Sequence, residues 1–500
     1  MYREEIIMKD ILRFDPEKYE LKMYTVDGRS VTCRAYMGLQ YCTNPSDPIQ
    51  KLHLFVPEVY YQDGCINGYR SDTAPVYMPN TVGGYMQGPA MEPGTDRFTG
   101  NANTAFEALF HGYVVACAGI RGWNTGEQSP EFFVGGDALE QEEGSGRLVG
   151  RAPAFITDMK AAIRFLRHNA DVIPGNLEHI ITNGTSAGGA LSALTGAAGN
   201  DPAFQPYLDE IGAAQERDDI YAASCYCPIH NLENADAAYE WLFEGQNAYK
   251  TMKFGKKDGK VFPLVMEGIQ TGEQTALSKE LARLFPAYLN SLGLTDTDGQ
   301  KLTLDEKGEG SFKEYVKKWL IRSAQREMHT HDTENRLARL AVSGSAIGQQ
   351  DYLTIEDGTV KDLEWNAYVR KIGRMKTTPA FDAVDLDSPE CKEFGDENVY
   401  ARHFTRFSAA HDKSGGEMAD EATVRIMNPL SFIGSADTAP HWRIRHGAFD
   451  RDTSLAIPVI LATVLQNKGF DIDFALPWGL PHSGDYDLRE QFEWIDSVCK

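Results

Sequence analysis

The strongest constraint on the fold is an alternation of strand and helix patterns that fills the first part of the chain, stops, and later resumes. Apolar runs typical of strands, at 113–122 and 178–186, flank a helix pattern at 155–171. The apolar residues of that helix pattern recur at helical spacing: Phe155, Met159, Ala162, Ile163 and Leu166. The alternation resumes with a strand pattern at 441–454 and a helix pattern at 455–469. Such alternation predicts an α/β fold with a parallel sheet covered by helices on both faces.

Between these two blocks lies a long segment of different character. From 230 to 427 the patterns are helical, charged and irregular, with an apolar stripe in 310–325 and further helix patterns at 279–293 and 333–347. An insertion of this length within a loop is usually functional. The sequence therefore predicts three parts: a first α/β core segment at 1–229, an inserted, mainly helical domain at 230–427, and a second core segment at 428–500.

Composition and charge exclude several classes of partner. The chain has 500 residues and a formal net charge of −23 at pH 7, which disfavours nucleic acids and anionic membranes because their phosphates require Lys and Arg. No apolar run reaches the ~18–20 residues that cross a bilayer, and residues 1–20 lack the features of a signal peptide. A cytoplasmic location is therefore expected. The eight cysteines form no CxxC pair and no zinc-site spacing, so reduced thiols and no metal are predicted; the oligomeric state stays open.

A single serine stands among glycines at 184–188, where the chain reads Gly-Thr-Ser-Ala-Gly. This is the only G-x-S-x-G match in the chain, and it lies between an apolar strand pattern and a small-residue helix pattern. In such an elbow the serine has a strained backbone, and the glycines let strand and helix approach each other. The G-x-G-x-x-G pattern and the Walker lysine are absent. We interpret Ser186 as a nucleophile, with an ordinary small-residue turn as the alternative.

A serine nucleophile needs a histidine base and an acid that orients the base. In α/β-hydrolases these follow the serine in the order acid, then histidine, each after one of the last strands. Asp450 and His482 occupy these places and are the predicted acid and base. Asp452 is a rival acid, because residues two apart on an extended segment point the same way. His446 is expected to have a core or hydrogen-bonded role instead.

An oxyanion hole requires two convergent backbone amides. The first is predicted at Ala187, which begins the helix pattern after the serine. The second is predicted at Gly84, in a Gly-Gly pair that follows an early strand pattern and resembles the HGGG-type loop of esterases. An ordinary glycine turn is the alternative interpretation of this loop.

With these residues in place, the chain resembles the bacterial tannases, the intracellular type that hydrolyses gallate esters. The resemblance covers most of the chain and is strongest in five stretches: 184–194, 238–243, 373–382, 441–454 and 479–487. The fungal tannase and feruloyl esterase branch has a cysteine directly before both the serine and the histidine, joined as a disulfide. Thr185 and Pro481 stand at those positions here.

The resemblance implies an α/β-hydrolase fold whose insertion is a lid domain. The implied reaction is hydrolysis of a small phenolic ester, a galloyl ester, through a Ser–His–Asp triad and an acyl-enzyme, without metal or cofactor. A feruloyl or general aryl carboxylesterase is the alternative, and a catalytically silent hydrolase fold used for binding is the alternative from another class. The intact order of Ser, Asp and His disfavours the silent fold. The preferred alcohol and the physiological ester stay open.

The resemblance also implies how the substrate is held. In bacterial tannases a lysine and a glutamate of the lid, and an aspartate two residues beyond the triad acid, bind the hydroxyls of the galloyl ring. This leaves Asp450 as the triad acid, and Lys371 is a nearby rival for the lysine. Carboxylates accept from phenolic hydroxyls and an ammonium donates to them. The implied substrate contacts are Lys376, Glu390 and Asp452, with Ile229 and Pro389 as apolar walls.

Overall fold

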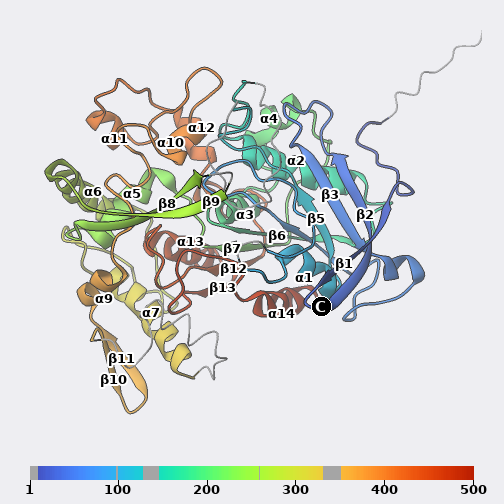
Figure 1. Cartoon of the computed structure of the whole chain (residues 1–500). Coiled ribbons are helices and arrows are strands. Elements are labelled where there is room, and N and C mark those ends of the chain that lie inside the picture. The colour runs from blue at the N-terminus through green and yellow to red at the C-terminus, as the bar shows by residue number, and fades with distance from the viewer. Residues whose placement is uncertain (1–9, 97–98, 128–145, 258–259, 330–350) are drawn as a thin grey trace, which may run out of the picture.

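The computed structural model describes residues 10–96, 99–127, 146–257, 260–329 and 351–500. Its centre is a nine-stranded sheet in the order β1-β2-β3-β5-β4-β6-β7-β12-β13 (Figure 1). The strands are β1 Glu20–Val26, β2 Arg29–Gln40, β3 Lys51–Pro57, β4 Pro75–Pro79, β5 Val114–Ala118, β6 Asn176–Thr185, β7 Ala222–Tyr226, β12 His441–Arg445 and β13 Asp471–Ala475. The helix predicted at 333–347 lies outside the described residues.

The sheet is mixed rather than wholly parallel. The strands β5, β4, β6, β7, β12 and β13 run parallel to one another, as the alternation of patterns predicts. At the N-terminal edge, β1 pairs with β2, β2 with β3 and β3 with β5 in antiparallel fashion. Asp27 and Gly28, with φ angles of 51° and 73°, join β1 to β2. A two-residue turn of this type reverses the chain direction, whereas parallel strands need a long crossover.

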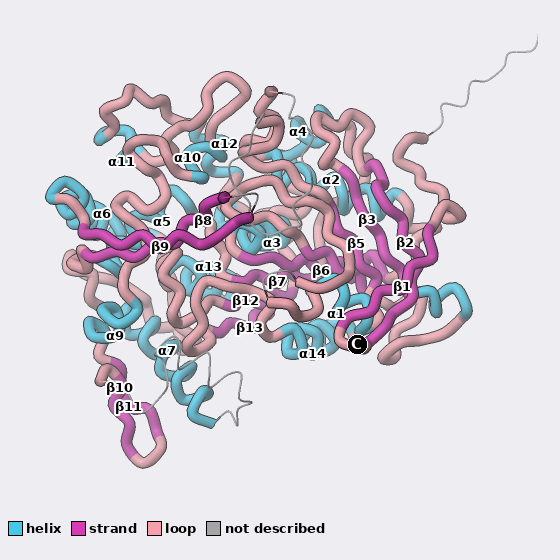
Figure 2. Tube along the Cα trace, viewed as in Figure 1, coloured by secondary structure: helices cyan, strands magenta, loops and turns pink. Residues whose placement is uncertain are grey.

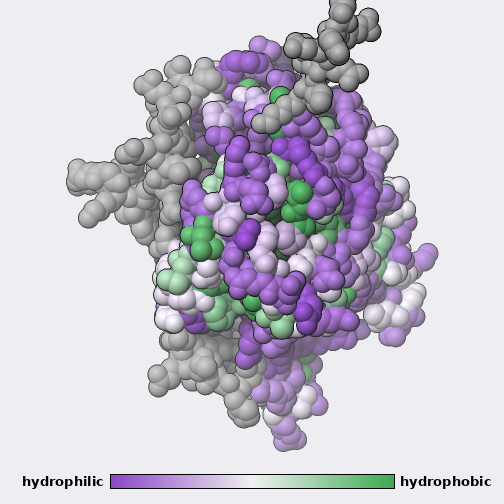
Figure 3. Space-filling view, turned by 90° about the vertical axis from the view of Figure 1, so that its right-hand side faces the viewer, coloured by the Kyte–Doolittle hydropathy of each residue, from purple (hydrophilic) through white to green (hydrophobic). Residues whose placement is uncertain are grey.

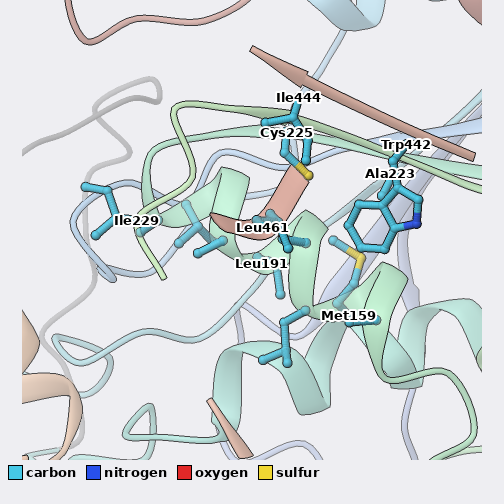
Figure 4. Packing of buried hydrophobic residues seen from close by; sticks show 14 of the residues in the cluster. Met159, Leu191, Ala223, Cys225, Ile229, Trp442, Ile444 and Leu461 are labelled. Carbon is cyan, nitrogen blue, oxygen red and sulfur yellow. The ribbon is translucent and has the colours of Figure 1, made fainter. Parts of the chain in front are cut away.

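Helices cover both faces of this sheet. The core helices are α1 Thr104–His111, α2 Ala154–His168, α3 Ala187–Ala197, α4 Gln205–Glu210, α13 Ala456–Asn467 and α14 Leu488–Cys499. Met159 of α2, Leu191 of α3 and Leu461 of α13 pack on one face against Trp442 and Ile444 of β12 (Figure 4). On the other face α1 lies beside α14. Burial on both faces explains why β5 and β7 are buried at every position.

Residues 230–427 lie between β7 and β12 and contain helices and two hairpins (Figure 2). The helices are α5 Leu232–Phe243, α6 Gly272–Ser291, α7 Ser311–His329, α9 Trp365–Ile372, α10 Pro389–Glu393, α11 Arg406–His411 and α12 Glu421–Ile426, and the hairpins are β8 Ala248–Lys257 with β9 Lys260–Ile269 and β10 Leu353–Glu356 with β11 Thr359–Leu363. The sequence patterns predict only the helices. The β10–β11 hairpin turns at Asp357 and Gly358, with φ angles of 46° and 72°, so a local signal for it was present.

The surface at the β1 edge of the sheet is mostly hydrophilic, with small separate hydrophobic patches (Figure 3). Leu21 and Met23 of β1 are among the exposed large hydrophobic residues. Of the helices in the described residues, none combines the length and the apolar character that a membrane span requires. The hydrophilic surface accords with the excess of 72 acidic over 49 basic residues.

Candidate active site

Ser186 lies at the sharp turn between β6 and α3, where the glycine pattern predicts it. Its φ and ψ angles are 62° and −124°, a region that non-glycine residues rarely adopt. A Cβ atom at position 184 would lie 2.3 Å from the carbonyl oxygen of Gly188, and one at 188 would lie 2.7 Å from that of Val82. The two glycines therefore allow β6, α3 and the 80–84 loop to approach the serine.

Asp450 and His482 meet in the loops that follow β12 and β13. Nδ1 of His482 lies 2.7 Å from Oδ2 of Asp450, 32 positions away in the sequence. The Asp450 side chain is fully buried, and its Oδ1 also accepts a hydrogen bond from the backbone N–H of Asp452 at 2.8 Å. Adjacent parallel strands end at the same edge of a sheet, and this is the edge at which Ser186 follows β6.

The charges of this pair support each other. Burial alone would raise the pKa of Asp450, but the neighbouring His482 and His446 and its hydrogen bonds lower that pKa to about 2. Burial alone would lower the pKa of His482, but the nearby Asp450 outweighs it and raises that pKa well above its usual value. An ionised Asp450 therefore holds a proton on Nδ1 of His482 and directs Nε2 to the opposite side of the ring.

The two candidate acids have different partners. Asp450 contacts His482, whereas Oδ2 of Asp452 lies 3.0 Å from Nζ of Lys376. The rival Lys371 is exposed on α9. In the structure His482 therefore pairs with Asp450 and Lys376 pairs with Asp452. The two-residue spacing of the aspartates alone could not decide which of them meets the histidine.

The Tyr239 phenol ties the Lys376 segment to the Asp450 loop. Its oxygen accepts hydrogen bonds from the backbone N–H groups of Met375 and Lys376, each at 3.0 Å. Its O–H donates to the carbonyl oxygen of Arg451 at 2.9 Å. Arg451, which lies between Asp450 and Asp452, is thus held to the segment that carries Lys376.

Glu390 lies on α10 and is only 5% exposed. The helix is held at its start by Ser388, whose Oγ donates to the carbonyl oxygen of Phe381 at 2.5 Å. Burial raises the pKa of Glu390 to about 7, although the positive charge of Lys376 opposes this shift. Glu390 is therefore a carboxyl group that changes charge near neutral pH.

The two predicted apolar walls lie in different settings. Ile229 is buried beside the elbow: its N–H donates to the carbonyl oxygen of Ser186 at 3.2 Å, and its carbonyl oxygen accepts from the Tyr85 hydroxyl at 2.6 Å. Pro389 is exposed at the first position of α10, next to Glu390. Ile229 is thus placed by the elbow and Pro389 by the helix of Glu390.

The loop after β4 lies against the elbow. Nδ2 of Asn80 donates to the carbonyl oxygens of Asn183 and Gly188, each at 3.0 Å. Gly84, farther along this loop, has a φ of 55°. Ala187 begins α3, so its N–H has no acceptor within the helix. Among the described residues, no protein acceptor takes a hydrogen bond from the Gly84 or Ala187 amide, so each keeps an unused hydrogen-bond donor.

Sequence reasoning did not identify Asn80, Tyr239 or Cys227, which also adjoin the site. Sγ of Cys227 lies 3.8 Å from Nε2 of His482 and 3.4 Å from the carbonyl oxygen of Ser483. The one signal for Cys227 was its place directly after β7, at the edge where the other site residues follow their strands.

Two groups of side chains have the composition of a metal site. Within the described part of the chain, these groups are Cys227–Asp450–His482 and Asp382–Cys391–His403. In each group the possible ligand atoms lie within 4.8 Å of one another. In the second group Asp382 already accepts hydrogen bonds from Nδ1 of His403 and from the N–H of Thr405, each at 2.7 Å. Hydrogen bonds therefore satisfy the buried Asp382 carboxylate without an ion.

Comparison with known proteins supports the class that the fold and the site define. The BD-FAE family model matches residues 147–254, which include the elbow. Esterase LipQ of Mycobacterium tuberculosis is 36% identical over 90 residues, which are 18% of this chain and 20% of that protein. The chain thus spans about a fifth of this curated relative. The protein is a carboxylic ester hydrolase with an α/β-hydrolase fold.

Solved structures cover nearly the whole chain. Tannase from Lactobacillus plantarum is 45% identical over 98% of this chain and 100% of that chain, with a TM-score of 0.88. Fusobacterium nucleatum tannase is 44% identical over 98% of this chain and 99% of that chain, with a TM-score of 0.87. The chain belongs to the bacterial tannase family.

Proposed function

We propose that this esterase hydrolyses galloyl esters through Ser186, His482 and Asp450. The observation that carries the proposal is the Lys376–Asp452 ion pair, two residues from Asp450, whose side chains are only 21% and 14% exposed. A solved tannin acyl hydrolase in complex with ethyl gallate, 45% identical to this chain, supports the same substrate class.

In the proposed reaction, Oγ of Ser186 attacks the ester carbonyl carbon while Nε2 of His482 takes the hydroxyl proton. The amides of Ala187 and Gly84 bind the oxyanion as it forms. His482 then gives the proton to the departing alcohol, and Asp450 stabilises the imidazolium in the interval. A water molecule, deprotonated by His482, hydrolyses the acyl-enzyme and restores the serine.

The ring of the substrate is proposed to bind through its hydroxyls. Lys376 donates to them, Glu390 and Asp452 accept from them, and Ile229 and Pro389 bound the ring. Because a buried charge left without a partner is costly, a ring without hydroxyls is a poor substrate for such a site.

We further propose that residues 230–427 act as a lid over the core formed by 1–229 and 428–500. The support is that Lys376 and Glu390 both belong to this segment, while the residues proposed for the chemistry belong to the core. The lid thus supplies Lys376 and Glu390 to the ring site, and the core supplies Asp452 together with the residues of the reaction.

The proposal is tested by a series of esters that differ in their ring hydroxyls. We expect kcat/KM to fall from methyl gallate to methyl 3,4-dihydroxybenzoate to methyl benzoate. A hydrogen bond to a charged group contributes about 1.5–3 kcal/mol, so each lost contact should cost about 10- to 150-fold. Methyl ferulate should also be poor, because it has one hydroxyl and its vinyl spacer displaces the carbonyl carbon.

The controls are the matched variants Lys376→Met and Lys371→Met. Lys376→Met should lower kcat/KM for methyl gallate and leave that for methyl benzoate near the wild-type value, whereas Lys371→Met should change neither. Equal rates on methyl ferulate and methyl gallate would favour the feruloyl or aryl carboxylesterase alternative and contradict the proposal.

Glu390 predicts a pH dependence that is confined to hydroxylated substrates. With its pKa raised to about 7, Glu390 is neutral below that pH and charged above it. Only the charged form accepts through both oxygens, so the ratio of kcat/KM for methyl gallate to that for p-nitrophenyl acetate should rise as the pH increases from about 6 to about 8. Because hydrolysis of both esters depends on His482, the effect of His482 titration cancels in this ratio.

Glu390→Gln is the matched variant for this measurement. Its side chain stays neutral at every pH, so the ratio of the two kcat/KM values should become flat and lie near the low-pH value of the wild type. A wild-type ratio that does not change through neutral pH would show that Glu390 does not bind the ring in its charged form.

A further inference from the structure

Cys227 is a buried cysteine that the proposed reaction does not use. Two residues close to Cys227 in the chain form hydrogen bonds with the backbone of Ser186. The N–H of Ser186 donates to the carbonyl oxygen of Tyr226 at 3.0 Å, and the N–H of Ile229 donates to the carbonyl oxygen of Ser186 at 3.2 Å. Cys227 itself has a φ of 34°, and its side chain has no solvent exposure. The thiol is therefore fixed between the elbow and the loop that carries His482.

The separation of the Cys227 thiol and the His482 imidazole suits a shared ion. Sγ of Cys227 lies 3.8 Å from Nε2 of His482. A tetrahedral zinc ion, about 2.3 Å from a cysteine sulfur and about 2.0–2.1 Å from a histidine nitrogen, holds those two atoms about 3.5 Å apart. The ion would therefore fit between them with a shift of a few tenths of an ångström.

Asp450 completes the arrangement from the other side of the imidazole. It occupies Nδ1 of His482 at 2.7 Å, so the lone pair of Nε2 points away from Asp450. Histidines that bind metals are commonly held in this way by a carboxylate on the second ring nitrogen. His482 is thus oriented for a metal by the same contact that orients it as a base.

We propose that Cys227 and His482 form an inhibitory site for a soft divalent cation, with Zn²⁺ as its representative. The ion forms bonds to Sγ and Nε2, the thiol proton and any proton on Nε2 pass to solvent, and water completes the coordination. No electron is transferred. Because the ion occupies the lone pair that must accept the proton of Ser186, hydrolysis stops until a chelator removes the ion.

The proposal rests on the proposed role of His482 as the base and is independent of galloyl recognition. It is therefore tested with p-nitrophenyl acetate, which has no galloyl group, on the full chain in zinc-buffered solution. Wild-type hydrolysis should be inhibited by zinc and restored by EDTA. In Cys227→Ser and Cys227→Ala, each compared with its own zinc-free rate, half-inhibition should require at least about tenfold more zinc.

Two matched variants separate this site from others. Cys65→Ser removes an exposed cysteine and should keep the wild-type sensitivity to zinc. Cys391→Ser disrupts the Asp382–Cys391–His403 group and should also keep it. If zinc sensitivity is instead lost in Cys391→Ser and kept in both Cys227 variants, the ion binds in the lid and the proposal is overturned.

A second readout does not depend on activity. Cd²⁺ bound to a thiolate gives a charge-transfer absorption. Because other cysteines also bind Cd²⁺, the expected result is a weaker absorption in Cys227→Ala than in the wild type at the same Cd²⁺ concentration. An absorption of equal intensity in the wild type and in a folded Cys227→Ala protein would overturn the assignment. Failure of zinc to inhibit the wild type at any soluble concentration would overturn it as well, whichever esters the enzyme prefers.

Discussion

Replacement of Ser186 by alanine is expected to lower kcat about 10⁴- to 10⁶-fold on every ester, because the members of a nucleophilic triad act as a unit. The fold should be retained. Alanine keeps the Cβ atom, and within the part of the chain that the structure describes no hydrogen bond of the turn uses the serine hydroxyl. The contacts of residue 186 with Tyr226, Ile229 and Ala190 are all made by its backbone. Initial rates with methyl gallate and p-nitrophenyl acetate, together with the melting temperature, measure both expectations.

Ser186→Gly is the matched control for the backbone. It should be as inactive as Ser186→Ala, and it should melt at the same or a higher temperature because glycine adopts the φ of 62° without strain. Residual turnover by folded Ser186→Ala well above the expected range would place the nucleophile elsewhere and remove the basis of the proposed mechanism.

Replacement of Asp450 by asparagine is the second change with a large expected effect, a loss of about 10⁴-fold in kcat on all esters. Asp450 is fully buried and accepts the hydrogen bond of His482 at Nδ1. An amide in its place can donate to Nδ1 and so favour the tautomer that carries its proton on Nε2. That tautomer cannot take the proton of Ser186.

Asp452→Asn is the matched control, two residues away in the same loop. It removes a charge that pairs with Lys376 and leaves the His482–Asp450 contact in place. It should raise KM for methyl gallate and have little effect on kcat for p-nitrophenyl acetate. If Asp452→Asn lowered kcat for p-nitrophenyl acetate more than Asp450→Asn, the two carboxylates would have the opposite roles.

The elements of the fold were predictable where the signal is local. The helix over α2 follows from apolar spacing, and the β1–β2 hairpin follows from its Asp-Gly turn. The order of the strands was not predictable, because the pairing of β7 with β12 joins segments on either side of residues 230–427. No local pattern encodes that pairing, since both strands are buried at nearly every position and read alike.

In the candidate site, too, some residues are identified by a local sequence pattern and others only by contacts between distant segments. The glycines that surround Ser186 indicate a turn in which strand and helix come close together, so the turn and its serine could be located from the sequence. The choice between Asp450 and Asp452 depends on which of them meets His482 and which meets Lys376, and these are contacts between distant segments. No catalytic motif includes Cys227. Tyr239 belongs to the stretch 238–243 that carries the family resemblance, but that stretch assigns it no contact, and only the structure places the two residues beside His482 and the Asp450 loop.

The late position of β12 and β13 in the chain has a consequence during synthesis. A nascent chain that ends before His441 already contains Ser186 and all of residues 230–427, yet it lacks the acid and the histidine and leaves the β7 edge of the sheet unpaired. An unpaired apolar edge is a template for pairing with another chain, and pairings between distant segments form slowly. Docking of β12 beside β7 therefore does two things at once: it pairs this apolar edge, and it brings the Asp450 loop to the end of the sheet where Ser186 lies.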